Sequence, residues 1–455
     1  MRVTLGPVMS RVETDTPGEL MEARRAVTVY VPGFQFSFAF RAKRWNGKRC
    51  FLHLRGKDRT AGEILTGLVP FVAHTAKRVE YLEGEGNGGS LPPLQLPEKL
   101  PELRDYQVNA VEEMRRKRRG IIELAAGAGK TEIAIAFTSD FLARAPGPVL
   151  YLCYGVSLVK QCYARFSRSM PDVGIVLRDR LELTDGVVIA SVTTLYKHRR
   201  KFLPFLEGVQ ALILDECQLS TSDTWHLLGL LCTAAENRFG LSATPFTGDP
   251  VRDLLLIGQT SQPIAQISAA RLVEMGYTAR PDVRMVRAGH RSYGEYEDAV
   301  RGGIVENSWR NGAIASLAAR HPEARILILV ARTAHGETLQ ELVPGSVFVH
   351  GGVAVKKRDE AFASRVAIAT SVADFGLDLD VDVLILAGGG RGKGSDHEPV
   401  RLVQRLGRGQ RRHRGKAEVI VYDFFDAGDR HLEKHSRERR KAWESEGFPP
   451  KMEVI

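Results

Sequence analysis

The sequence lacks the features that mark several protein classes. Its five cysteines form no C-x-x-C pair, so neither a zinc site nor a disulfide framework is predicted. Most of them lie in apolar runs, where a buried free thiol is the ordinary interpretation. The N-terminal MRVTLGPVMSRVETD has no apolar core like that of a signal peptide. Because no stretch approaches the roughly 18 apolar residues of a membrane span, we expect a cytoplasmic protein without a membrane partner.

The composition is that of an ordinary globular protein. Hydrophobic residues make up 44% and charged residues 26% of the 455 residues. Domains usually contain roughly 100 to 200 residues, so two or three are expected. The net charge of +10 favours a polyanionic partner, above all nucleic acid. Simple solubility is the alternative explanation for this charge.

A linker separates a small N-terminal unit from the rest of the chain. Residues 84–101 read GEGNGGSLPPLQLPEKLP, a glycine run followed by prolines. Alternating apolar residues in the N-terminal unit indicate strands, and Asn46-Gly47 is a hairpin-turn signal. The strand pattern is carried by Val27, Val29, Val31, Phe34, Phe36, Phe38 and Phe40, and a helix expected from near Thr60 carries Ile64, Leu65 and Leu68.

Beyond residue 103, short apolar runs alternate with helix-like stretches. Such near-continuous runs are typical of buried parallel strands. They predict an α/β fold with two tandem doubly wound parallel-sheet lobes behind a small α+β domain, with boundaries at 1–90, 91–280 and 281–455. The runs are Gly120–Leu124, Val149–Leu152, Val187–Ala190, Ala211–Leu214 and Arg238–Leu241, then Val283–Val286, Ile326–Val330, Val347–Val349, Val366–Ala369, Val383–Leu386 and Val419–Tyr422.

A small-residue loop joins the first of these strands to a helical stretch, as in a P-loop. Its backbone N–H groups would wrap phosphates, with help from the helix dipole. Lys130 would reach the β and γ phosphates of ATP, and Thr131 would ligate Mg²⁺. Leu124 stands where the general pattern has its first glycine. The predicted cradle consists of Ala126, Gly127, Ala128, Gly129, Lys130 and Thr131.

An acidic pair follows the buried strand Ala211–Leu214. Asp215 at the strand end would hold Mg²⁺, and Glu216 would orient and deprotonate the attacking water. A lone Asp-Glu pair is often only a solvated strand end. Two motifs in the expected order make that alternative weak.

These residues resemble superfamily 2 helicases, and further motifs extend the resemblance. Leu103–Gln107 is similar to the adenine-recognition segment, in which Gln107 would read the base and Arg104 would pack against it. Leu241–Pro245 matches motif III, which couples hydrolysis to strand movement. Motifs Ia and Ib imply nucleic-acid contacts at Ser157, Gln161, Ser191 and Thr194.

The resemblance also covers the second lobe, and it implies a RecA-like fold for both lobes. Motif V implies a nucleic-acid contact at Thr370 and nucleotide contacts at Gly376 and Asp378. Motif VI places Gln404, Arg408 and Arg411 in the catalytic set. A guanidinium can stabilise the charge of the transferring phosphoryl group. A generic basic patch is the alternative for this arginine-rich stretch.

One position departs from the family pattern. Helicases of this kind usually carry His or Asp at the fourth place of motif II, where this chain has Gln218. Glutamine keeps hydrogen-bonding capacity but carries no charge. The departure puts the coupling between hydrolysis and motif III in doubt.

A basic hairpin in the N-terminal unit is a further nucleic-acid candidate. Cationic groups bind phosphates, and an exposed aromatic ring can stack on a base. The alternative is a core tryptophan beside a solvated edge that discourages strand pairing. The candidates are Lys43, Arg44, Trp45, Lys48 and Arg49.

The nearest form of the resemblance is to UvsW-type phage branch-migration helicases. It implies an ATP- and Mg²⁺-dependent enzyme that remodels forked, branched or single-stranded DNA. We expect a monomer, in the host cytoplasm if the gene is phage-encoded. An RNA helicase and a weakly hydrolysing annealing clamp are the alternatives, because backbone contacts carry little base information.

Overall fold

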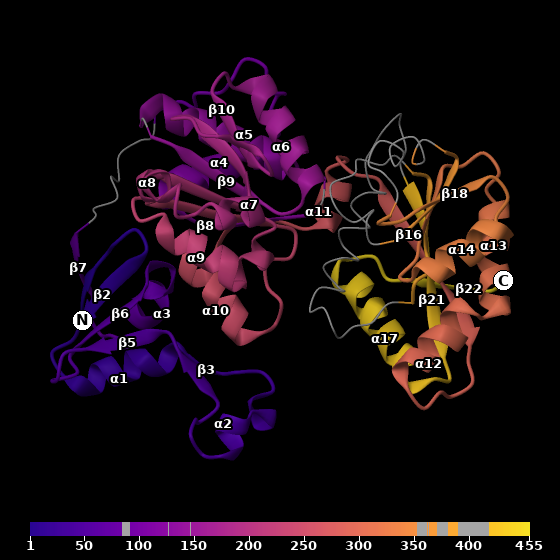
Figure 1. Cartoon of the computed structure of the whole chain (residues 1–455), viewed down its shortest axis with the longest axis horizontal. Coiled ribbons are helices and arrows are strands. Elements are labelled where there is room, and N and C mark those ends of the chain that lie inside the picture. Colours follow the sequence, from indigo (N-terminus) through magenta and orange to yellow (C-terminus); the bar gives the residue numbers. More distant parts are fainter. Residues whose placement is uncertain are drawn as a thin grey trace. The chain divides into compact units, whose positions relative to one another are not determined.

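The computed structural model describes residues 1–83, 92–125, 127–145, 147–352, 362, 364–370, 381–389 and 418–455. The chain forms two compact units. The first contains Met1–Leu124 and Gly129–Gln266, and the second contains Ala125–Ala128 and Ile267–Ile455. The fold agrees with the predicted class, since each unit contains a sheet of mainly parallel strands (Figure 1). The predicted boundaries at 90 and 280 stay predictions.

The N-terminal part of the first unit has its own five-stranded sheet, in the order β5-β6-β2-β1-β7. The apolar face of this sheet packs against helix α10 (Pro250–Gln259) of the neighbouring lobe, in one shared core. The backbone approaches so closely at Gly67 that a Cβ there would lie 1.9 Å from the Ile257 carbonyl oxygen. The elements are β1 (Arg2–Thr4), β2 (Met9–Glu13), α1 (Pro17–Ala26), β5 (Leu52–Arg55), β6 (Ala61–Leu65), η2 (Thr66–Leu68), α3 (Val69–Ala73) and β7 (Glu80–Glu83).

The predicted helix from near Thr60 is wrong. Residues 61–65 form β6, which pairs antiparallel with β2 and β5. Helix begins only at Thr66, first as a 3₁₀ turn and then as α3. Tertiary pairing therefore decided the conformation of Ile64 and Leu65, whose apolar spacing fits either state.

The predicted phenylalanine strand is also wrong. Phe34–Phe36 is a 3₁₀ turn (η1), and Phe38–Arg41 is a short helix (α2). Gly33 turns the chain with a φ of +74°, a conformation that glycine adopts without strain. The segment lies between β3 (Thr28–Tyr30) and β4 (Lys48–Cys50), which pair antiparallel. The expected turn at Asn46-Gly47 is present, with Gly47 at a φ of +76°.

The first lobe is built on an eight-stranded sheet, and its five predicted strands are confirmed. The order is β11-β10-β12-β9-β13-β14-β8-β15, and the central strands run parallel. The carboxyl ends of β8, β13 and β14 therefore meet at one edge. The strands are β8 (Arg119–Leu124), β9 (Val149–Cys153), β10 (Val173–Leu177), β11 (Arg180–Glu182), β12 (Val187–Ser191), β13 (Ala211–Asp215), β14 (Asn237–Ser242) and β15 (Pro263–Ile267).

Helices cover this sheet and complete its apolar core. Long α5 carries a nearly continuous buried face from Ile133 to Phe137, as expected for a helix packed against a parallel sheet. The helices of this lobe, besides α10, are α4 (Asp105–Lys117), α5 (Lys130–Arg144), α6 (Val156–Ser169), α7 (Val192–Lys197), α8 (Leu203–Gly208), η3 (Cys217–Thr221) and α9 (Asp223–Leu231).

The second unit contains a seven-stranded sheet in the order β18-β19-β17-β20-β21-β16-β22. Its pairs are parallel, and all six predicted strands of this half are confirmed. The elements are α11 (Ala269–Glu274), β16 (Arg280–Gly289), α12 (Tyr296–Val300), η4 (Arg301–Val305), α13 (Ser308–Ala319), β17 (Ile326–Leu329), α14 (Thr333–Leu342), β18 (Ser346–Val349), β19 (Val366–Ala369), β20 (Val383–Leu386), β21 (Glu418–Ala427), α17 (Arg430–Ser445) and β22 (Lys451–Glu453).

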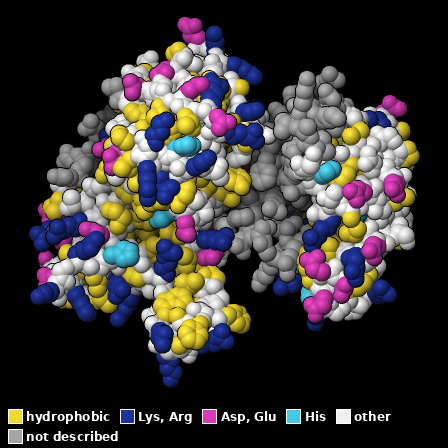
Figure 2. All heavy atoms as spheres, viewed as in Figure 1, with side chains coloured by type: hydrophobic (Ala, Val, Ile, Leu, Met, Phe, Trp, Pro, Cys, Tyr) yellow, Lys and Arg dark blue, Asp and Glu magenta, His cyan; other side chains and the backbone are white. Residues whose placement is uncertain are grey.

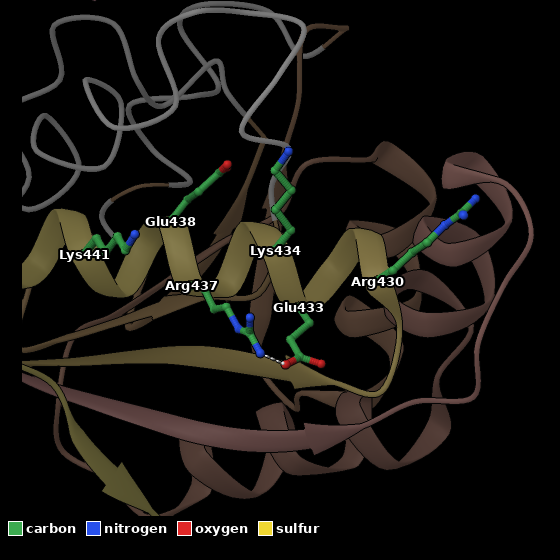
Figure 3. A pocket seen from close by; sticks show the side chains of 6 residues that line it. All are labelled: Arg430, Glu433, Lys434, Arg437, Glu438 and Lys441. Atoms are coloured by element: carbon green, nitrogen blue, oxygen red, sulfur yellow. Dashed lines mark hydrogen bonds and ion pairs between the residues drawn. The ribbon is translucent and has the colours of Figure 1, made fainter.

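Helix α17 has one buried and one charged face. Its outer face forms a shallow hollow lined by four basic and two acidic residues, in which Arg437 donates to Glu433 at 2.6 Å (Figure 3). Its inner face buries Arg439 and Trp443 against β21. Among the described residues, no helix is long and apolar enough to cross a membrane.

Candidate functional site

The phosphate loop lies between β8 and α5, as predicted. Gly127 and Gly129 adopt φ values of +82° and +81°, which strain any residue with a Cβ. A Cβ on Gly129 would also lie 2.2 Å from the Gln107 amide nitrogen. The loop therefore needs glycine at Gly129 for two independent reasons. Ala126 lies outside the described residues, and Ala128 is buried.

Lys130 and Thr131 form the first turn of α5. The Lys130 ammonium donates to the Leu124 carbonyl at 3.1 Å, which brings it back over the loop. Thr131 is half-buried beside it. The N–H groups at the start of a helix and a nearby ammonium are groups that attract an anion.

The predicted adenine-recognition residues lie at the start of α4. The Gln107 side-chain oxygen accepts from the Arg104 N–H at 2.9 Å, which caps the helix. Arg104 also donates to the Tyr106 hydroxyl at 2.9 Å. The structure thus brings Gln107 next to Gly129 of the phosphate loop, and Arg104 bonds both Gln107 and the buried Tyr106.

The acidic pair lies at the same sheet edge, at the end of β13. Burial raises the pKa of Asp215 to about 6, with a further contribution from the neighbouring Glu216 and an opposing one from Lys130. The Cys162 thiol lies 4.0 Å from Asp215. A carboxylate this buried favours a cationic partner, which is the property required of a metal ligand.

A chain of hydrogen bonds runs from motif II to motif III. The Gln218 amide donates to Glu216 at 2.9 Å, and its carbonyl accepts from the Ser242 hydroxyl at 2.7 Å. Ser242 in turn accepts from the Thr244 N–H at 3.0 Å. Gln218 and Ser242 are buried, at 4% and 0% exposure. The neutral glutamine therefore connects Glu216 to β14, a link that the sequence put in doubt.

Sequence reasoning did not include Ser242 among the site residues. The motif around it was visible in the sequence. Its partner was not, because the contact depends on β13 and β14 being neighbours in the sheet. The order of strands in a sheet cannot be deduced from a local sequence pattern.

The predicted nucleic-acid contacts of the lobes differ in exposure. Ser157 is exposed at the start of α6, and Gln161 is half-buried one turn later. Ser191 and Thr194 are buried, and Thr194 accepts from the Arg178 N–H at 3.1 Å. In the second unit, Thr370 is 9% exposed after β19.

The basic residues of the N-terminal hairpin are exposed, but its tryptophan is not free. Lys43, Arg44, Lys48 and Arg49 all face solvent. Trp45 is half-buried, and its indole N–H donates to the Lys48 carbonyl at 2.9 Å. The tryptophan thus fixes the turn of its own hairpin.

Five further candidates lie outside the described residues. They are Gly376, Asp378, Gln404, Arg408 and Arg411, the motif V and VI residues of the catalytic and nucleotide-binding sets. Their roles stay predictions.

The oxygen ligands at the sheet edge fit Mg²⁺ better than a transition metal. Within the described part of the chain, no cluster of three or more His, Cys, Asp or Glu could hold a metal by itself. Mg²⁺ at nucleotide sites usually needs only one or two protein oxygens besides water and phosphates. Asp215 and Thr131 supply that kind of donor.

A parallel-sheet lobe with a phosphate loop, an acidic strand end and a linked third motif defines a nucleotide-binding lobe of the helicase type. In agreement, residues 100–247 match the family "Type III restriction enzyme, res subunit". These matches support the resemblance to superfamily 2 helicases that the motifs predict.

Two relatives and one of the solved structures illustrate what this chain is similar to. The DNA 3'-5' translocase XPB2 of Sulfurisphaera tokodaii is 30% identical over 172 residues, which cover 37% of each chain. The ATP-dependent DNA helicase uvsW of Enterobacteria phage T4 is 22% identical over 350 residues, or 71% of this chain and 68% of that protein. A putative HsdR subunit of a type I restriction enzyme from Vibrio vulnificus YJ016 aligns with a TM-score of 0.56 at 16% identity, covering 77% of this chain and 67% of that one. The structural likeness supports the tandem-lobe fold.

Proposed function

We propose that the protein is an ATP-dependent DNA helicase or translocase that remodels forked or branched DNA. The observation that carries this proposal is the hydrogen-bonded path Glu216–Gln218–Ser242, which starts at the phosphate-site edge. An ATPase without a motor needs no such connection to motif III. The net charge of +10 fits a nucleic-acid partner. The names of the two curated relatives support DNA as that partner.

The candidate residues of the first lobe divide between phosphate binding, catalysis and base selection. Lys130 binds the β and γ phosphates, and the glycine loop cradles them. Glu216 orients the attacking water and accepts its proton. Mg²⁺, held by Asp215 and Thr131, would neutralise phosphate charge when bound. Gln107 and Arg104 take no part in this step, since their proposed role is to select the adenine base.

The second lobe would complete the reaction. Gln404, Arg408 and Arg411 are proposed to stabilise the transition-state charge, with Gly376 and Asp378 contacting the nucleotide. A contribution of about 10³- to 10⁵-fold is typical of such arginines. Hydrolysis would then depend on the approach of the two lobes, which would move the bound DNA.

The proposal predicts ATP hydrolysis that forked DNA stimulates and that both Lys130→Ala and Glu216→Gln abolish. An ATPase titration against forked DNA, duplex, single strands and RNA, at one salt concentration, measures this. Lys117→Ala, an exposed lysine at the end of α4, is the control and should behave as wild type. Stronger stimulation by RNA would select an RNA helicase instead. Undiminished ATP turnover in both variants would contradict the proposal. Nucleic-acid binding by the wild-type protein without any ATP turnover would favour an annealing clamp.

A further inference from the structure

The segment from Thr28 to Cys50, here called the aromatic arm, has no role in the nucleotide site. It consists of β3, η1, α2 and β4, and its two strands form a separate small sheet. In Figure 1, α2 lies at the outer end of this arm, away from the five-stranded sheet. A structured arm at the periphery of a compact unit suggests a binding surface.

The four alternating phenylalanines of the arm divide into two pairs. Phe34 stacks on Tyr30 with ring centroids 5.0 Å apart and meets Phe40 edge-on at 4.7 Å. Phe34 and Phe40 thus form the internal core of the arm. Phe36 and Phe38 point outward, with 75% and 72% of their surface exposed. Exposed apolar surface of this kind, when contiguous, is typical of interaction sites.

The conformation that exposes the rings is fixed rather than frayed. The Phe36 N–H donates to the Gly33 carbonyl at 3.0 Å, and the Ser37 N–H donates to the Phe34 carbonyl at 3.0 Å. Arg41 donates to the Phe36 carbonyl at 3.1 Å. Gly47 lets Phe34 lie close against the turn, since a Cβ there would lie 2.3 Å from its ring. The rings are therefore presented before any partner binds.

Charge identifies the kind of partner. Residues 28–50 contain no Asp or Glu and five basic residues, namely Arg41, Lys43, Arg44, Lys48 and Arg49. All five are exposed, and Figure 2 shows yellow side chains bordered by dark blue ones at the lower end of the first unit. The Arg44 guanidinium lies 6.0 Å from the Phe38 ring centre. An aromatic surface with a purely cationic rim complements nucleobases and their phosphates.

We propose that the aromatic arm binds unpaired nucleotides, with Phe36 and Phe38 stacking on nucleobases and the surrounding basic residues holding the phosphates. This deepens the proposed function and rests on it, because it names the part of a forked substrate that the arm recognises. Phe36 and Phe38 are more exposed than the half-buried Trp45, whose indole N–H donates to the Lys48 carbonyl at 2.9 Å and so holds the turn. Duplex DNA offers no free base faces along its length, so the arm distinguishes a fork from a duplex.

The test is binding of a fluorescent oligothymidylate of about 15 nucleotides, without ATP, followed by anisotropy. Phe36→Ala and Phe38→Ala should each weaken binding at least about five-fold, as expected for a lost stacking contact. Tyr81→Ala is the matched control, because Tyr81 is a 53% exposed ring of the same domain next to Glu80. Phe36→Tyr and Phe38→Tyr should retain binding, which separates loss of the ring from misfolding.

Salt dependence distinguishes stacking from charge. The phenylalanine variants should keep the wild-type slope of affinity against salt, whereas Arg44→Gln with Lys48→Gln should reduce it. Blunt duplex binding should be unaffected by the phenylalanine changes. Equal binding by the alanine variants and Tyr81→Ala, or an equal loss on duplex, would overturn the proposal. So would arm-dependent binding to phosphatidylserine vesicles with oligonucleotide binding intact.

This test is separate from that of the proposed function. Binding is measured without ATP, so a protein that never hydrolyses ATP could still bind oligothymidylate through the arm. Conversely, DNA-stimulated hydrolysis with no effect of Phe36 or Phe38 on binding would remove the arm's role and leave the motor proposal intact.

Discussion

At the scale of single residues, Gln218 positions Glu216. Its amide donates to Glu216, and its carbonyl is held by the Ser242 hydroxyl. We predict that Gln218→Ala lowers DNA-stimulated turnover roughly ten-fold or more, because the general base is no longer held in position. Ser242→Ala removes the hydrogen bond to the Gln218 carbonyl and should have a similar effect. Since both changes break one connection, the double variant should be little worse than either single one. Turnover numbers from a double-mutant cycle measure this.

Ser220 provides the control for that cycle. It lies on the same short helix as Gln218 and is fully buried, yet its hydroxyl has no partner among the described residues. Ser220→Ala should leave turnover unchanged, and ATP affinity should be similar in all variants. Losses that simply multiply in the double variant would show that Gln218 and Ser242 act independently.

His335 makes stability depend on pH. Burial, with a smaller contribution from Arg310, lowers the pKa of His335 to about 3, and its ring nitrogen bonds the Asn311 oxygen at 2.9 Å. Below the ordinary histidine pKa of about 6.5, the side chain of His335 is protonated in the unfolded chain but stays neutral in the folded chain. Stability is therefore complete above about pH 6.5 and falls on acidification, by up to about 1.4 kcal/mol per pH unit from this group.

Urea unfolding at several pH values between about 7 and 5 tests this prediction. His335→Gln keeps an amide donor toward Asn311 and should flatten the decline in stability. His74→Gln, at an exposed histidine, should leave the decline unchanged. Parallel wild-type and His335→Gln curves would contradict the assignment.

At the scale of elements, buried charges attach α17 to the sheet. Burial alone would raise the pKa of Asp426, but Arg310, His290 and Arg439 hold it below its ordinary value. Arg310 bonds Asp426 directly, and Arg439 bonds Asp423 at 3.0 Å. Arg310 comes from α13, the two aspartates from β21 and Arg439 from α17, while His290 directly follows β16, so the network joins several elements.

We predict that Asp426→Ala destabilises the fold by about 3–5 kcal/mol, because Arg310 and Arg439 would remain buried without it. The measurement is the midpoint of urea unfolding. Glu444→Ala removes an exposed pair on the same helix, in which Arg440 donates to Glu444 at 2.9 Å, and should cost less than about 0.5 kcal/mol. A similar small loss in both variants would mean that the network contributes little.

Elements differed in how well the sequence predicted them. The parallel strands could be predicted from their apolar runs, because a strand that is buried on both faces consists almost entirely of apolar residues. The order of those strands, and with it the Gln218–Ser242 contact, depends on long-range pairing. Phe34 to Phe40 alternate like a strand, but Gly33 and the Tyr30 ring determine a helical turn instead. The phosphate loop was predictable because its chemistry requires glycine and lysine at fixed spacing.

At the scale of the whole molecule, the N-terminal sheet and the first lobe form one unit with a shared core. Leu68 is fully buried in that core together with Val251, Leu254 and Ile257 of α10. The base of the aromatic arm packs against the same core through Val29, Val31 and Cys50, which joins the arm to the lobe that contains Lys130. The glycine-rich linker does not by itself make the N-terminal part independent, because packing rather than chain connection joins the two.

This arrangement predicts that Leu68→Ala weakens both parts together. A buried leucine truncated to alanine costs about 2–5 kcal/mol, and here the cavity borders both the N-terminal sheet and α10. Hydrogen exchange should therefore accelerate in β2, β6 and α10 at once, while β17 in the second unit serves as an internal control and keeps its rate. Faster exchange confined to residues 1–83 would instead show a domain that unfolds alone, and the arm would then be free to move relative to the nucleotide site.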